Sequence, residues 1–201
     1  MLIDFRKLFP KYNIKPKGVL HVGANIGEEA PVYNQLGIQN VAWFEANPEI
    51  FSRLKTNIQD YPNQIAYNYA IGDKNEKVTL HVSNNGSQSS SVLELGTHKT
   101  QHPEVFYTHD VEVEMRTLDG FKFPFEMDFL NMDIQGYELH ALKGMGDMIK
   151  DFNWVYIEVN KQELYQGCGL YDDICHYLGA YGLYPVESKW IGGWGDALFT
   201  R

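Results

Sequence analysis

The chain has 201 residues, of which 44% are hydrophobic and 21% charged, so it carries enough apolar material for a core and too little charge for a disordered chain. This length fits one folding unit, and we expect residues 1–201 to form a single domain. A net charge of −9 repels phosphate backbones, so we expect no nucleic-acid partner.

Cysteine spacing and hydropathy exclude further classes of protein. Cys168 and Cys175 lie outside any CxxC spacing, which argues against a disulfide framework or a thiolate metal site. The first residues lack the sustained apolar segment of a secretory signal, and no run of 18 apolar residues occurs. We therefore expect a cytoplasmic protein without a membrane span.

From residue 18 onward, short apolar runs alternate with helical patterns, which is typical of a parallel sheet covered by helices. The sequence thus predicts an α/β fold. The expected elements of the first half are a strand at 18–22, a helix ending at 36–37, a strand at 41–45, a helix at 47–58, and strands at 65–71 and 77–82.

Regular patterning then stops between about 83 and 110. This segment is rich in Ser, Asn, Gln, Thr and His, and it is too long for a plain connection. Long loops of this kind often carry function, so we expect an acceptor loop or a lid here.

Patterning resumes after this segment. The expected elements are strands at 111–116 and 129–133, a helix at 137–149, a strand at 154–158, a helix at 171–181, and an antiparallel pair, 183–188 with 196–201, around a Gly-rich turn at 190–195.

Four predicted strands end in residues that suit a binding site. A glycine turn begins at Gly23, Glu45 and Asp133 end two other strands, and a Gly-Asp turn ends at Asp73. In an open parallel sheet, ligands bind outside the carboxyl ends of the strands. We therefore expect these positions to converge on one crevice.

The first two strand ends indicate an adenosine-containing ligand. Glu45 follows Gly23 by 22 positions, close to the spacing of about 20 for a carboxylate that holds a ribose diol. A dinucleotide fingerprint would need glycines at Asn25 and Glu28. Glu28 and Glu29 would also repel a pyrophosphate at the helix N-terminus, although they could simply complement the helix dipole. A sulfonium cofactor is favoured, and a nicotinamide-dependent oxidoreductase or a noncatalytic adenosyl- or glycan-binding module remains an alternative.

Six blocks occur in order along nearly the whole chain: residues 21–27 (HVGANIG), 44–48 (FEANP), 70–73 (AIGD), 117–119 (TLD), 133–138 (DIQGYE) with 142–144 (LKG), and 195–198 (GDAL). Together they resemble the FkbM family of S-adenosylmethionine-dependent methyltransferases. The resemblance implies a Rossmann-like class I methyltransferase fold, with a mostly parallel seven-strand sheet, a reversed last strand and helices on both faces. It also implies O-methylation, often of sugar hydroxyls in glycans or secondary metabolites.

The resemblance implies S-adenosyl-L-methionine as the cofactor. The glycine turn would surround its methionine portion, Glu45 would hold its ribose, and residues 70–73 would line its adenine. His21 departs from the acidic residue that many class I methyltransferases have at its position. The residues assigned to the cofactor are His21, Gly23, Ala24, Asn25, Gly27, Glu45, Ala46, Ala70, Ile71, Asp73 and Ser90.

The resemblance also places Asp133 and Glu158 beside the transferred methyl group. A carboxylate or a histidine near the transfer axis can take the proton of an alcohol. Asp133 is the first choice for this base, and the loop histidines His98, His102 and His109 are alternatives.

We expect the acceptor to be a hydroxyl of a sugar in a glycan or glycoconjugate. Trp190 and Trp194 offer flat faces to a sugar ring, although hairpin packing explains them as well. A second scheme has Mg²⁺ bound by Asp133, Glu158 and Asn160. We expect no metal, because the motif lacks an adjacent second carboxylate and hard cations gather several oxygen ligands.

Overall fold

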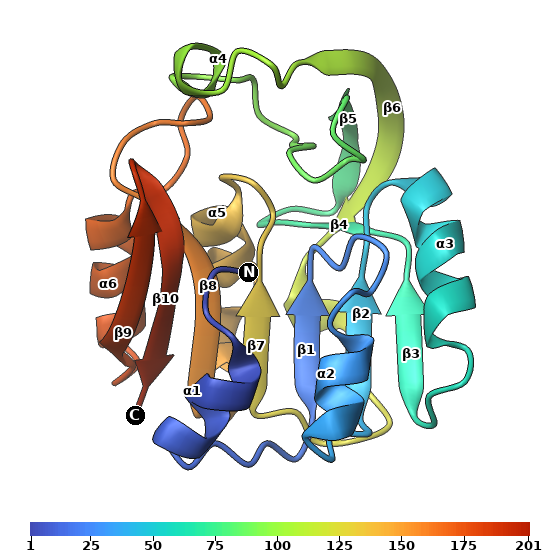
Figure 1. Cartoon of the computed structure of the whole chain (residues 1–201), viewed down its shortest axis with the longest axis vertical. Coiled ribbons are helices and arrows are strands. Elements are labelled where there is room, and N and C mark those ends of the chain that lie inside the picture. The colour runs from blue at the N-terminus through green and yellow to red at the C-terminus, as the bar shows by residue number, and fades with distance from the viewer.

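The computed structural model describes residues 1–201 and forms a twisted seven-strand sheet with helices packed on both faces (Figure 1). All strands run parallel except β10, which is antiparallel to both of its neighbours. The predicted Rossmann-like sheet with a reversed last strand is confirmed. In sheet order the strands are β3 (Gln64–Tyr67), β2 (Val41–Phe44), β1 (Val19–Val22), β7 (Phe129–Met132), β8 (Trp154–Asn160), β10 (Trp194–Thr200) and β9 (Tyr184–Ile191).

Helices cover both faces, and the central strands are therefore buried on both sides. Leu20 belongs to the core under α5 (Glu138–Lys143) and α6 (Tyr171–Gly179), whereas its neighbour Val19 belongs to the opposite core. The second core packs against α1 (Phe5–Lys11), α2 (Ala30–Gln35) and α3 (Pro48–Ile58). No helix is both long enough and apolar enough to cross a bilayer.

Two predicted elements are each divided in the structure. The expected strand at 65–71 becomes β3 and β4 (Ala70–Ile71), because the Asn68 amide donates to the carbonyls of Glu45 and Ala46 and turns the chain out of the main sheet. The expected helix at 137–149 stops after residue 143, and a 3₁₀ helix follows at Gly146–Asp151. The φ of 51° at Gly146 prevents a right-handed α-helix from continuing through this residue.

The expected loop is shorter than predicted, because residues 107–110 belong to β6 (Tyr107–Arg116). β6 pairs with β4 and with β5 (Glu76–Ser83) in a separate three-strand sheet, and a short helix, α4 (His98–Gln101), lies within the loop. Most of the predicted turn at 190–195 is also strand, since β9 and β10 leave only two glycines between them. The antiparallel pairing expected there is confirmed.

Two structural features were not expected from the sequence. The first is α1, which buries Phe5, Leu8 and Phe9. The second is a 3₁₀ turn at Leu118–Gly120, which contacts the 3₁₀ helix after α5.

A buried carboxylate organises the turn between β7 and α5. Glu138 is 1% exposed, and its Oε1 accepts hydrogen bonds from the N–H groups of Ile134 (2.9 Å) and Gly136 (3.2 Å). These bonds hold Gln135 at a φ of 55°, a conformation that non-glycine residues seldom adopt. Burial raises the pKa of Glu138 to about 7, and the charge of Asp133 acts in the same direction against the two N–H donors.

This raised pKa predicts how stability depends on pH. The folded chain keeps the Glu138 proton between pH 4.5 and about 7, where the unfolded chain has lost it, so stability falls as pH rises through this range. Glu138→Gln keeps an acceptor oxygen but has no proton to lose. Its unfolding free energy relative to wild type should therefore increase by about 1–3 kcal/mol between pH 4.5 and 8, measured by urea denaturation.

Glu49→Gln is the matched control, since Glu49 is exposed in the first turn of α3. Its stability curve should run parallel to the wild-type curve. If the Glu138→Gln curve is also parallel, the carboxylate is ionised in the folded chain and the burial argument is wrong.

Candidate active site

The carboxyl ends of β2, β1, β7 and β8 open into one cavity of about 480 Å³. A cavity of this size is typical of small-molecule sites. Gly23, Glu45, Asp133 and Glu158 all line it, so the structure brings together residues that lie up to 135 positions apart.

Most of the residues assigned from the sequence line this cavity, and three do not. Gly27 packs against α3, where a Cβ would lie 2.7 Å from Leu54 Cδ1. Asp73 lies outside the lining residues, and His109 is exposed on β6 with its Nδ1 bonded to a neighbouring threonine. The assigned residues that line the cavity are His21, Gly23, Ala24, Asn25, Glu45, Ala46, Ala70, Ile71, Ser90, Asp133 and Glu158.

The glycine turn exists because two strand ends approach each other closely. Gly23 has a φ of 84°, and a Cβ at this position would lie 1.8 Å from the Asp133 carbonyl oxygen. Only glycine allows both the conformation and the contact. The floor of the cavity therefore requires glycine at this position.

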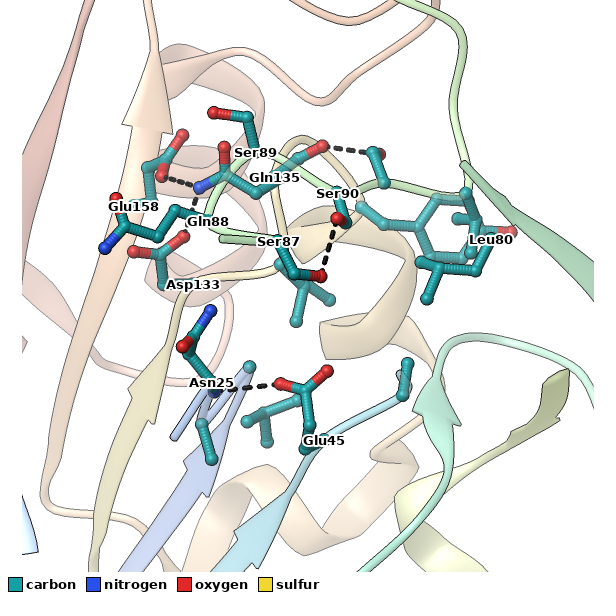
Figure 2. Close-up of a pocket in the computed structure, with 18 of the residues that line it drawn as sticks. Asn25, Glu45, Leu80, Ser87, Gln88, Ser89, Ser90, Asp133, Gln135 and Glu158 are labelled. Atoms are coloured by element: carbon teal, nitrogen blue, oxygen red, sulfur yellow. Dashed lines mark hydrogen bonds between the residues drawn. The ribbon is translucent and has the colours of Figure 1, made fainter. Parts of the chain in front are cut away.

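Glu45 closes the end of β2 against this turn. Its carboxylate accepts hydrogen bonds from the N–H groups of Asn25 and Asn47, each at 2.8 Å, and Figure 2 shows the first of these bonds. Burial raises the pKa of Glu45 to about 7, although both N–H donors oppose the shift. Each oxygen keeps a lone pair, so the carboxylate can still accept from two hydroxyl groups.

His21 lies on the floor of the cavity as a neutral side chain. It is 3% exposed, it stacks on Trp43 at 4.7 Å between ring centroids, and its Nδ1 lies 3.2 Å from the Tyr33 hydroxyl. Burial lowers the pKa of His21 to about 3. Glu29 also lines the cavity, and its Oε2 lies 4.0 Å from His21 Nε2. Glu29 therefore places a carboxylate beside His21, the residue that stands in place of an acidic one.

A bridging amide joins the two carboxylates at the other side of the cavity. The Gln135 Nε2 donates to Asp133 Oδ1 at 2.5 Å and to Glu158 Oε2 at 2.6 Å (Figure 2). Its Oε1 accepts from the Tyr165 hydroxyl at 2.5 Å. Burial, and then the charge of Asp133, raise the pKa of Glu158 well above its usual range. Our sequence reasoning missed Gln135, although its place inside the DIQGYE block was the available signal.

The Ser-rich loop crosses the cavity and is tied to the glycine turn. The Asn25 amide donates to the Gly86 carbonyl, and the Asn47 amide donates to the Ser87 hydroxyl, each at 3.2 Å. These contacts place the loop over the residues that follow β1 and β2. The loop therefore forms a roof over this end of the cavity.

The same loop is also tied to the carboxylate side. Ser91 donates to the Gln135 carbonyl at 2.7 Å, and Leu95 forms a β-bridge with Tyr165. Ser90 supports the loop itself, with its hydroxyl 2.7 Å from that of Ser87. One segment thus spans the whole width of the cavity.

Solved structures with the same fold include two methyltransferases. The magnesium protoporphyrin IX methyltransferase of Synechocystis PCC 6803, solved with bound SAM, matches with a TM-score of 0.56 and 11% identity over 98% of this chain and 75% of that chain. The ribosomal protein L11 methylase of Lactobacillus delbrueckii subsp. bulgaricus matches with a TM-score of 0.54 and 12% identity over 98% and 75%. At these identities the similarity establishes the fold.

Two curated proteins are similar in sequence. The 2-O-methyltransferase NoeI of Sinorhizobium fredii is 26% identical over 159 residues, which are 74% of this chain and 65% of that protein. The hexuronic acid methyltransferase AglP of Haloferax volcanii is 26% identical over 146 residues, 69% of this chain and 54% of that protein. The chain spans between about half and two thirds of the length of these relatives.

A family model gives the broadest match to the sequence. The methyltransferase FkbM domain matches residues 21–183, a range that contains the end of β1, the glycine turn, the loop, and the carboxylates of Glu45, Asp133 and Glu158. Because this match covers most of the chain, the protein belongs to the FkbM methyltransferase family.

Proposed function

We propose that this protein is an S-adenosylmethionine-dependent O-methyltransferase that acts on a hydroxyl of a sugar in a glycan or glycoconjugate. The observation that carries the proposal is that one cavity contains two sets of acids. The buried Glu45 suits a ribose diol, and the linked side chains of Asp133 and Glu158 suit proton removal. Family membership and the names of the two curated relatives support the same activity.

The residues of the cavity fit the cofactor. Glu45 offers two carboxylate oxygens at the end of β2, and Leu80, Ala70 and Ile71 provide an apolar wall for an adenine ring. Glu28 and Glu29 line the turn where a dinucleotide would place its pyrophosphate, so charge opposes a nicotinamide cofactor. A zwitterionic methionine portion carries no phosphate and avoids this repulsion.

The chemistry required of the side chains is limited. When bound, S-adenosylmethionine supplies a methyl group on a good leaving group. Asp133 is the base in this proposal: its Oδ1 is fixed by Gln135, and its Oδ2 is left to accept the proton of the acceptor hydroxyl. Gln135 and Glu158 position this carboxylate, because the amide holds both side chains at hydrogen-bond distance.

The cofactor assignment predicts a ligand-specific gain in stability. S-adenosylhomocysteine at about 100 times its dissociation constant should raise the unfolding free energy by about 2.7 kcal/mol, measured by thermal denaturation, whereas NAD should have no effect. Stabilisation by NAD alone would instead support the oxidoreductase alternative.

A variant pair tests the ribose contact. Glu45→Gln removes the charge that strengthens hydrogen bonds to the diol, so the affinity for S-adenosylhomocysteine should fall about tenfold or more in calorimetry. Glu49→Gln, four residues further on and exposed, should bind as wild type does. Equal affinities for the two variants would show that Glu45 does not hold the ribose.

The base is tested by Asp133→Asn. Only the transition state needs the base, so turnover should fall by about 10²-fold or more while S-adenosylhomocysteine affinity stays nearly unchanged. Asp147→Asn, on an exposed 3₁₀ turn, is the matched control. Activity is read as tritiated methyl transfer onto a panel of sugars, and a full rate for Asp133→Asn would assign the proton to another group.

Chelation tests the alternative in which a metal activates the hydroxyl. The Gln135 amide places its N–H groups between Asp133 and Glu158. A cation bound between these carboxylates would need oxygen ligands there, and an N–H group cannot serve as one. EDTA should therefore leave the rate unchanged. Loss of activity that Mg²⁺ or Mn²⁺ restores would make Asp133 a metal ligand.

A further inference from the structure

The charges that line the cavity are mostly negative, and the terminal ammonium of Met1 lies among them. Six carboxylic side chains line it, and no lysine or arginine does. The nearby Lys161 is directed elsewhere, with its Nζ 4.2 Å from the centre of the Trp190 ring. The six are Glu28, Glu29, Glu45, Glu104, Asp133 and Glu158.

The cavity has an acceptor half, which we define as the part lined by His98, Glu104, Val105, Leu164, Tyr165 and Trp194. These residues come from the loop, from the segment after β8 and from the start of β10. They therefore lie beyond β7 and β8, on the opposite side of the base from Glu45.

The acceptor half contains no lysine or arginine. His98 is 5% exposed, and its Nδ1 has no hydrogen-bond partner. Burial lowers the pKa of His98, so its imidazole is neutral and adds no positive charge to this half. Trp194, which is partly exposed, adds aromatic surface of the kind that packs on sugar rings, and the buried Tyr165 lies behind this part of the cavity.

A bound cofactor does not reverse this charge. S-adenosylmethionine carries an ammonium, a sulfonium and a carboxylate, so it adds a single net positive charge. Even with Glu29, Glu45 and Glu158 protonated, the three remaining carboxylic side chains outnumber the two positive charges of Met1 and the cofactor. An anionic acceptor would thus enter a partly buried site whose remaining charge is negative, and like charges brought together at an interface oppose binding strongly.

On the basis of the proposed function, we infer that the acceptor is a neutral or amino-bearing sugar and that the site rejects sugars carrying a carboxylate, sulfate or phosphate. The inference separates this chain from its relative AglP, whose name states that it acts on a hexuronic acid. The difference lies in the substrate charge and leaves the shared reaction class unchanged.

Matched triads of methyl glycosides test this charge preference. Each triad has one ring configuration, gluco, galacto or manno, in a neutral, a 2-amino and a uronic acid form. For any configuration that is methylated, kcat/KM for the uronic acid should be at least about 30-fold below that of the neutral or amino form, and added salt should narrow the gap. A uronic acid methylated as well as its neutral partner would overturn the inference and leave the methyltransferase proposal intact.

A pair of loop variants tests the source of the preference. Each of two glutamates has its Oε1 3.7 Å from a histidine nitrogen: Glu104 from His102 Nδ1, and Glu94 from His81 Nε2. Glu104 lines the cavity, whereas Glu94 does not line it. Glu104→Gln should raise the ratio of uronic acid to neutral rates by about threefold or more, and Glu94→Gln should leave this ratio unchanged. Equal ratios for both variants would remove Glu104 from the argument and count against it.

Binding separates this inference from the proposed function. Saturation-transfer NMR on the S-adenosylhomocysteine complex reports sugar binding without turnover. If no triad member is methylated, the proposed function fails, and the binding order still decides the charge preference. Stronger binding of the neutral and amino forms supports the inference, and equal or stronger binding of the uronic acid overturns it.

Discussion

The close approach of two strand ends determines the rest of the site. At Gly23 the backbone passes so near the Asp133 carbonyl that no side chain fits, and the N–H groups of Gly23 and Ala24 both bond to the Phe44 carbonyl. Three strand ends are thereby locked together over a few ångströms. The turn that we propose for the cofactor and the residue that we propose as the base therefore share one rigid framework, which is what precise positioning of two reactants requires.

Buried acids are the second constraint, and each is held by donors. Glu45 and Glu138 both accept two backbone N–H groups, while Glu158 takes the side-chain amide of Gln135. These donors offset part of the cost of removing a carboxylate from water. The acids thus serve the architecture of the strand ends as well as any ligand.

The sequence predicted the position of a residue well wherever that position follows from the order of strands and turns. Alternation and turn chemistry located the strands, and the strand-end rule brought Gly23, Glu45 and Asp133 to one cavity. Prediction from the sequence failed where tertiary contacts determine the position of a residue. Gly27 looks like a cofactor residue but makes room for Leu54, and His109 lies on a strand that pairs with β5. Gln135 was missed because an amide carries no charge signal and its role depends on two partners that only folding supplies.

The loop and the sheet ends contribute to the cavity in different ways. Gly23 and Glu45 are fixed by backbone geometry, whereas Glu104 and His98 lie on a segment whose side chains are not constrained by the sheet. Surface loops accept substitutions and insertions more readily than the elements they join. Acceptor range can therefore diverge, in evolution or in the laboratory, through substitutions at residues 98–105, while the part of the loop that is bonded to Asn25 and Asn47 stays unchanged.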